Sequence, residues 1–520
     1  MEAIRNSRYS RWQVVGMIVY ALLMTTILFI FLSGWAYDDP FITYRYAENL
    51  ANGEGFVYNP GERILSTTTP LYTLLLSPLA FLGAYLPAYA NLLGAFCLAL
   101  GGLSLWELSH TWKSPMVGWA GLMLYPTFPL LLITVGSETP IYLALCLATF
   151  AFYARGRYSL TAISAGLATL ARPDGALVAV VLGFDYLIRQ RKPIPWKATA
   201  IFLAILLGWG IFAWAYFGSP LPVTLAAKQH QGAMAISQQF FAGFFTILGW
   251  YASWPYTLES IIAVAGLVFA LWKGSTWIIF LLWSVLYFVS YSILGVSRYF
   301  WYYTPLVPGF VVAIGLGIAA VRHLPSQFSR LPSDISKQTS AGRDQLSALS
   351  RQPSAIGNKK SRILGHWFGV NHLPSVIGVV LFGFLVIAQG WDVVTTKLDR
   401  DNRFAIYRAI GEWLNANTLP EEKVGALEVG IIGYFAQRPM VDFAGLLQPQ
   451  IAQRMTAETD YEDAAVWAIE SYRPDYLVLH DGLFTDLEGG YLKQSCVQVK
   501  KFPGSQYGYG RDLNVYHCSK

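Results

Sequence analysis

Charged residues are scarce in this chain. Only 13% of its 520 residues are Asp, Glu, Lys or Arg, whereas hydrophobic residues make up 54% and aromatic residues 15%. A soluble globular chain has about 25% charged residues, and a single core in water cannot absorb this much apolar surface. The composition excludes a conventional cytosolic enzyme, a disordered chain, a coiled coil and a small disulfide scaffold. It predicts a polytopic α-helical membrane protein with a soluble part attached.

Common cofactor motifs are also missing. The four cysteines and seven histidines form no Cys-x-x-Cys and no paired His spacing. The glycine-rich stretch NGEGFVYNPGER lacks the Lys-Ser/Thr of a P-loop and therefore predicts tight turns. Cys97 and Cys146 fall in apolar segments and are interpreted as small apolar residues. Cys496 and Cys518 form a candidate disulfide, provided that the tail lies outside the reducing cytosol.

The net charge of +6 averages two unlike regions. Residues 1–391 hold 24 Lys and Arg against 13 Asp and Glu, whereas residues 392–520 hold 13 against 18. The basic pI is therefore no indication of nucleic-acid binding. The sequence predicts a transmembrane domain over residues 1–391 and a soluble domain over residues 392–520.

Apolar stretches predict about eleven transmembrane helices. Arg5, Arg8 and Arg11 precede the first of them, which is too long for a cleaved signal peptide, and they place the N-terminus in the cytoplasm. A short interfacial helix is predicted at Pro70–Leu82. The spans are predicted at residues 12–35, 85–109, 115–133, 139–154, 159–171, 174–190, 197–217, 256–273, 276–294, 299–321 and 373–391.

This count places the first loop, residues 36–69, outside the cell. The basic loop 322–372, predicted to be disordered, then lies in the cytoplasm, and the tail is extracytoplasmic. In the tail, helices are expected at Tyr407–Ala416 and Ala464–Ser471, and strands in VGALEV and DYLVLH. This alternation predicts a small α/β domain on the outer face of a multi-pass plasma-membrane protein.

The first loop is the densest polar segment near the membrane. Asp38 and Asp39 follow the first span directly, and mutual repulsion at a low-dielectric boundary is expected to raise the pKa of at least one of them. Such a carboxylate serves as a general base or a metal ligand; the alternative is an acidic cap on a helix end. The following FITYRYAENL places Tyr44, Ala47 and Glu48 on one helical face with Phe41.

Several motifs together resemble the polyprenyl-phosphate-dependent glycosyltransferases of the GT-C fold. The chain is similar to their terminal arabinofuranosyltransferase and mannosyltransferase-like branch. The resemblance rests on DDPFITYRYAENLANGEGFVYNPGER, TTTPLY, GSETPIY, ARPDG, GSPLPVTLAAK and SRYFWYYTPLVP, spread over roughly residues 35–310, and on EVGIIGYFAQRPMVDFAGLL in the tail. The charge-based topology places all of them on the outer side.

The resemblance implies transfer of a hexosyl or pentosyl group from a polyprenyl-phosphate donor to an envelope glycan, lipid or protein. A first-loop aspartate is then the base, and Asp39 is preferred with Asp38 as its partner. Glu138 assists this base or binds a divalent metal with Asp38 and Asp39; otherwise it caps a helix. Tyr44, Arg45, Glu48, Asp174 and His230 are further substrate-binding candidates, and the cations expected to hold the phosphate are Arg172, Lys228 and Arg298.

Some interpretations stay open at this point. Each of the three cations is alternatively a snorkelling interfacial residue. The aromatic stretches RYFWYYTP and GWYASWPY suit either an interfacial belt or a sugar-stacking surface. The whole chain is alternatively a transporter, a flippase for lipid-linked sugars, or a non-catalytic glycan-binding assembly protein. Against transport, the ionisable residues gather at one membrane face rather than at the midplane.

Overall fold

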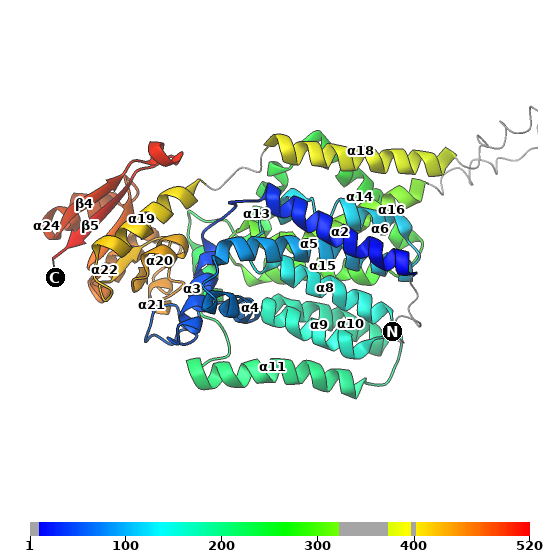
Figure 1. Cartoon of the computed structure of the whole chain (residues 1–520), viewed down its shortest axis with the longest axis horizontal. Helices are drawn as coiled ribbons and strands as arrows, with labels where there is room; N and C mark the ends of the chain where they lie inside the picture. Colours follow the sequence, from blue (N-terminus) through cyan, green and yellow to red (C-terminus); the bar gives the residue numbers. More distant parts are fainter. Residues whose placement is uncertain (1–9, 322–372, 397–401, 520) are drawn as a thin grey trace, which may run out of the picture.

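A computed structural model describes residues 10–321, 373–396 and 402–519. Long helices lie side by side in a bundle, and a smaller domain with a sheet sits at one end of it (Figure 1). We call this smaller domain, residues 402–519, the tail domain. The predicted disordered loop 322–372 and two of the three N-terminal arginines, Arg5 and Arg8, lie outside the described residues.

Among the described residues, six apolar helices are long enough to cross a membrane, so the chain is a polytopic α-helical membrane protein. The six are α2 (Arg11–Phe31), α5 (Leu86–Thr111), α11 (Trp196–Phe217), α14 (Trp254–Trp272), α18 (Leu373–Thr396) and the segment Phe300–Ala320, which contains most of α16 (Val307–Val321). Five shorter apolar helices are α4 (Pro70–Phe81), α8 (Thr139–Ala154), α9 (Tyr158–Ala171), α13 (Phe240–Trp250) and α15 (Ile278–Leu294).

Each of the eleven predicted spans contains a helix, but two differ from the expectation. Residues 115–133 form two short helices, α6 (Pro115–Met123) and α7 (Pro129–Leu132), because Pro126 and Pro129 interrupt the ladder of backbone hydrogen bonds. The segment 174–190 contains α10 (Ala176–Phe184), which widens into a π-turn over Asp185–Arg189. The expected interfacial helix is present as α4.

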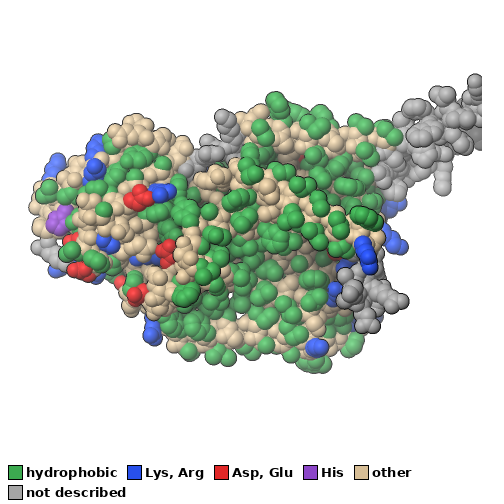
Figure 2. Space-filling model, viewed as in Figure 1, with side chains coloured by type: hydrophobic (Ala, Val, Ile, Leu, Met, Phe, Trp, Pro, Cys, Tyr) green, Lys and Arg blue, Asp and Glu red, His purple; other side chains and the backbone are tan. Residues whose placement is uncertain are grey.

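The two ends of the bundle differ in charge. Figure 2 shows hydrophobic side chains over the visible flank of the bundle, with Lys and Arg at the end far from the tail domain. Asp and Glu are seen on and beside the tail domain, where further Lys and Arg are also visible. This is the asymmetry on which the predicted orientation depends.

The first loop lies between the bundle and the tail domain. It forms α3 (Asp39–Ala51), which contacts both α4 and the tail-domain helix α20 (Gly430–Ala436). Phe41, Tyr44 and Ala47 on the predicted face are each less than 3% exposed. Because α3 is covered from two sides, residues on its other faces are buried as well. One hydrophobic core is shared by this loop and the tail domain.

The tail domain has a mixed five-stranded sheet in the order β2-β1-β3-β5-β4. The parallel strands β1 (Val424–Ala426), β2 (Met440–Asp442) and β3 (Tyr476–His480) are linked by helices, as the predicted alternation requires. The antiparallel strands β4 (Cys496–Phe502) and β5 (Leu513–Cys518) complete the sheet. The helices are α19 (Arg403–Asn417), α20, α21 (Pro449–Ala452), α22 (Tyr461–Tyr472), α23 (Thr485–Gly489) and α24 (Tyr491–Ser495).

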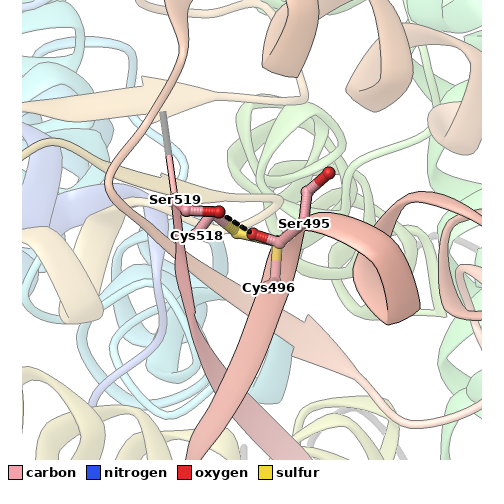
Figure 3. The surroundings of a disulfide bond; sticks show 4 residues. All are labelled: Ser495, Cys496, Cys518 and Ser519. Carbon is pink, nitrogen blue, oxygen red and sulfur yellow. Dashed lines mark hydrogen bonds between the residues drawn. A yellow bond between two sulfur atoms is a disulfide. The ribbon is translucent and has the colours of Figure 1, made fainter.

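A disulfide joins β4 at one edge of this sheet to its neighbour β5. Cys496 and Cys518 face each other in the β4–β5 register and are bonded through their sulfur atoms (Figure 3). Beside them, the Ser519 backbone N–H and hydroxyl both donate to the Ser495 carbonyl oxygen, at 2.9 and 3.0 Å. The bridge fastens the last residues of β5 to the start of β4.

Candidate active site

A cavity of about 650 Å³ lies where the bundle meets the tail domain. One part of its wall is charged and contains Asp39, Glu138, Arg172, Asp174 and Lys228. The rest is mainly apolar, with residues from α9, α10, α11, α12 (Thr224–Ala233) and α15 such as Leu170, Leu177, Leu206, Trp209, Leu225 and Leu294. The arrangement suits a ligand that has an anionic group and an apolar chain.

Asp39 and Lys228 form an ion pair at this charged wall. Asp39 is the first residue of α3, and its Oδ2 accepts a hydrogen bond from Lys228 Nζ at 3.2 Å. The Asp39 side chain remains 36% exposed, whereas that of Lys228 is only 8% exposed. Burial alone lowers the pKa of Lys228, but the Asp39 carboxylate and the nearby tyrosines outweigh burial and raise that pKa. Lys228 therefore remains a cation.

Arg172 is the second buried cation of the cavity. It follows the last residue of α9, and its Nη2 lies 3.0 Å from Asp174 Oδ2 while its Nε donates to Asp174 Oδ1 at 3.3 Å. A second carboxylate, Glu138 Oε1, lies 3.8 Å from Nη1. Burial raises the pKa of Glu138, and Arg172 opposes this rise. Tyr291 holds the arrangement by accepting from Arg172 Nη2 at 3.1 Å and donating to Asp174 at 2.9 Å.

Aromatic rings line the cavity beside these charges. Tyr37, Trp301 and Tyr302 are in its wall, and the ring of Trp301 stacks on that of Tyr37 with centroids 5.7 Å apart. Trp301 also stacks on Tyr299, with ring centroids 4.6 Å apart. Trp301 and Tyr302 belong to the stretch RYFWYYTP, for which the sequence allowed two interpretations, an interfacial belt and a sugar-stacking surface. Their position favours stacking for these two residues.

Asp38 points away from the cavity, although it precedes Asp39 directly. Its two carboxylate oxygens accept the backbone N–H groups of Gly430 at 3.0 Å and Ile431 at 2.7 Å. These are free N–H groups at the start of α20, so Asp38 caps a tail-domain helix. Burial, followed by the charge of Glu428, raises the pKa of Asp38 to about 8. Asp38 and Asp39 therefore do not form the expected pair of cavity carboxylates: Asp39 lines the cavity, whereas Asp38 caps α20.

Four further site candidates lie at other contacts rather than in the cavity wall. Tyr44 donates to the Gly136 carbonyl oxygen. Arg45 Nε donates to the Tyr58 carbonyl at 3.0 Å, and its other nitrogens donate to carbonyls of Gly433 and Arg438 in the tail domain. Contacts to the tail domain are also made by Glu48, which accepts from Gln437 Nε2 at 2.9 Å, and by His230, whose Nδ1 lies 3.2 Å from the Met455 carbonyl oxygen.

Arg298 and the expected metal set also differ from the sequence-based prediction. Arg298 does not line the cavity; its Nη1 donates to Gln238 Oε1 at 2.9 Å instead. The set Asp38, Asp39 and Glu138 is not assembled, because Asp38 faces α20. Within the described ranges, no three His, Cys, Asp or Glu residues are grouped as metal ligands. The charged wall consists of two acid–base clusters around Lys228 and Arg172.

Comparison with known proteins defines the class of fold. Over residues 394–516 the chain matches a family model described as "Domain of unknown function (DUF8728)". A crystal structure of ArnT from Cupriavidus metallidurans in the apo state aligns with 97% of this chain and 98% of its own, at a TM-score of 0.60 and 14% identity. An oligosaccharyltransferase from Archaeoglobus fulgidus aligns with 94% and 71%, at a TM-score of 0.53 and 12% identity. The chain thus has the GT-C fold, as the motifs imply.

A curated relative makes the same connection through sequence. The chain is 27% identical over 225 residues to the terminal beta-(1->2)-arabinofuranosyltransferase of Mycobacterium tuberculosis (strain ATCC 25618 / H37Rv). The match covers 38% of this chain and spans only about a third, 35%, of the relative's length. A second ArnT structure, described as bound to undecaprenyl phosphate, aligns at a TM-score of 0.58 with 15% identity and covers 98% of each chain. The chain thus shares its fold with ArnT and part of its sequence with an arabinofuranosyltransferase.

Proposed function

We propose that the chain transfers a sugar from a polyprenyl-phosphate donor to a hydroxyl group of an envelope glycan, lipid or protein. One observation carries this proposal. A partly exposed carboxylate, Asp39, and two buried cations, Lys228 and Arg172, lie in the wall of one cavity whose remaining surface is mainly apolar. A lipid-linked sugar phosphate needs all three: a base for the acceptor, cations for the phosphate and an apolar surface for the chain.

In the proposed reaction Asp39 is the general base. The acceptor oxygen attacks the anomeric carbon while its proton passes to the Asp39 carboxylate. The bond between that carbon and the phosphate oxygen breaks, and the polyprenyl phosphate leaves with the bonding electrons. Lys228 and Arg172 stabilise the negative charge that grows on the departing oxygen. Attack opposite the leaving group inverts the anomeric centre.

The apolar wall supports a lipid-linked donor. Leu177 of α10 and Leu206 and Trp209 of α11 continue the cavity away from the charges, between helices that are apolar over their length. The ArnT structure described as bound to undecaprenyl phosphate supports the same class of donor. Trp301 and Tyr302 offer aromatic faces to the sugar, which lies between the lipid phosphate and the acceptor.

The orientation in the membrane belongs to this proposal. With the tail domain outside the cell, residues 1–391 form the membrane-embedded catalytic part and residues 392–520 an outer domain, and the disulfide lies in an oxidising compartment. A Cys introduced at the exposed Ser505 of the tail domain should react with a membrane-impermeant maleimide on intact cells. A Cys at the exposed Arg191, in the loop before α11, should react only after permeabilisation. The reverse pattern contradicts the orientation.

The activity is tested by incubating purified protein with radiolabelled polyprenyl-phosphate sugars and envelope glycans. Asp39→Asn should abolish transfer, because an amide cannot take the proton. Glu48→Gln is the matched control, since Glu48 is on the same helix α3 but contacts Gln437 outside the cavity. Unchanged transfer by Asp39→Asn would remove Asp39 as the base. If the wild-type protein transfers sugar from none of these donors, the proposed function is contradicted.

A further inference from the structure

The turn after β2 brings the tail domain to the wall of the cavity. Asp442 ends β2 and is fully buried, and its carboxylate accepts the backbone N–H groups of Ala444 at 2.8 Å, Leu446 at 2.6 Å and Leu447 at 3.2 Å. Burial raises the pKa of Asp442 to about 7, against the effect of these three hydrogen bonds. The turn is therefore tightly held, and its Leu446 is part of the cavity wall.

Gln231 connects this turn to the bundle. It lies on α12 three residues after Lys228, hence on the same side of the helix, and its side chain is 1% exposed. Its Nε2 donates to the Ala444 carbonyl oxygen at 2.8 Å, and its Oε1 accepts from the Tyr299 hydroxyl, also at 2.8 Å. Both ends of the amide are thus occupied, one by the tail domain and one by the aromatic segment before α16.

Tyr299 in turn supports Lys228. The Lys228 ammonium group lies 3.8 Å from the centre of the Tyr299 ring, which is within cation–π distance. The backbone carbonyl of Lys228 accepts from the backbone N–H of Ser297 at 3.1 Å, two residues before Tyr299. Lys228 is therefore held at its backbone and at its charged end by the same short segment, in addition to its ion pair with Asp39.

We propose that Gln231 and Tyr299 are positioning residues that hold Lys228 in the cavity by linking it to the 442–448 turn of the tail domain. The proposal rests on the proposed function, because it assigns the donor phosphate to Lys228. It gives the tail domain, which matches a family of unknown function, a task at the donor site: its turn sets the place of a cation that binds the leaving group.

The first arm of the test measures binding of undecaprenyl phosphate to the purified full chain in detergent. Gln231→Leu removes both hydrogen bonds, whereas Tyr299→Phe keeps the ring beside Lys228 and removes the hydroxyl that donates to Gln231 and also contacts Tyr461. Each should weaken binding about fivefold, the value of one well-placed hydrogen bond. Gln229→Leu is the matched control, since Gln229 is exposed on the same helix and donates to the Leu294 carbonyl, and its affinity should change less than about twofold.

The double variant separates positioning from general loss of structure. If the two residues act through one chain of contacts, Gln231→Leu with Tyr299→Phe should bind no more weakly than either single variant. The proposal is overturned if the losses of affinity in the two single variants multiply in the double variant. It is also overturned if the single variants bind as well as Gln229→Leu. In the transfer assay the KM for the donor should rise in both single variants while the KM for the acceptor stays unchanged; an equal rise in both KM values contradicts a role at Lys228.

The two proposals fail in different ways. If the wild type binds undecaprenyl phosphate but transfers no sugar, the proposed function is wrong, and the binding arm still decides whether Gln231 and Tyr299 position Lys228. If the wild type does not bind undecaprenyl phosphate, both are wrong. If the wild type binds and transfers while the variants match the control, only the positioning role is wrong.

Discussion

Lys228 Nζ lies 3.2 Å from Asp39 Oδ2, although the two residues are 189 positions apart in the chain. In the ligand-free protein the proposed base and the proposed phosphate-binding cation therefore neutralise each other. A donor phosphate competes with Asp39 for Lys228, and it also meets the negative charge of Asp39. Affinity for the lipid phosphate and the ability to transfer should then respond in opposite directions to the loss of this carboxylate.

Asp39→Asn should bind undecaprenyl phosphate roughly three- to tenfold more tightly than the wild type, because it removes one repulsive charge and frees Lys228. Lys228→Met should weaken the same binding by about tenfold. Raising the salt concentration should reduce both differences, since part of the cavity is open to solvent. Weaker binding by Asp39→Asn, measured by titration in detergent, would contradict the competition.

Asp38 should make the stability of the protein depend on pH. Its pKa is 3.8 in the unfolded chain and about 8 in the fold, so between these values the native state keeps a proton that the unfolded state releases. Rising pH therefore favours unfolding: the stabilisation is complete below about pH 4 and is lost as pH rises towards 8. Relative to Asp38→Asn, the wild type should show a thermal midpoint that falls from pH 5 to pH 8. A constant difference between the two proteins would show that Asp38 does not titrate in this range.

Gly430 should be required for docking of the tail domain. A Cβ atom at this position would lie 2.0 Å from the Asp38 backbone oxygen, and its backbone N–H is one of the two that Asp38 accepts. Gly430→Ala should therefore push α20 away from the first loop and lower stability by about 1–3 kcal/mol. The control is Gly489→Ala, where a Cβ meets no atom within 4 Å. Thermal unfolding and proteolysis of the tail domain measure the effect; equal behaviour of the two variants contradicts it.

The charged residues of the cavity could be predicted because they lie at the ends of recognisable apolar segments. The charge pattern of the loops places Asp39, Glu138, Arg172 and Lys228 on one side of the membrane, and the structure brings these four into one cavity wall. Residues 115–133 were predicted as one span but form two helices, and Pro126 and Pro129 were the signal that could have shown this. In the tail, hydrophobic patterning identified α19, α22, β1 and β3, whereas the two longest strands, β4 and β5, and the shorter helices were not predicted.

The division of labour between Asp38 and Asp39 could not be predicted. Adjacent residues look equivalent in a sequence, and the partner that distinguishes Asp38 is a backbone N–H 392 positions away. Gln231 was overlooked for a similar reason: an amide on a short polar helix carries no pattern that reveals its contact with Ala444, 213 positions later. Arg298 had a suitable charge and topology, but its contact with Gln238 directs it elsewhere. Tertiary contacts between distant segments decide such cases.

Glu259 is expected to destabilise the fold. It lies on the membrane helix α14 with a fully buried side chain, and within the described part of the chain neither carboxylate oxygen has a hydrogen-bond partner. Its neighbourhood already contains a carboxylate, Asp392 of α18, which accepts from the Tyr256 hydroxyl at 2.9 Å. A buried carboxyl group without a partner destabilises a membrane bundle.

Glu259→Gln should therefore leave the thermal midpoint unchanged or raise it, and Glu259→Met, which buries no polar group, should raise it further. Glu107→Gln is the matched comparison, because Glu107 lies on the membrane helix α5 but forms an ion pair with Arg155. Removing that partner leaves a partly buried cation and should lower the midpoint. The same ranking is expected in several detergents. A fall in the midpoint for Glu259→Gln as large as that for Glu107→Gln would show that Glu259 makes a stabilising interaction in the membrane.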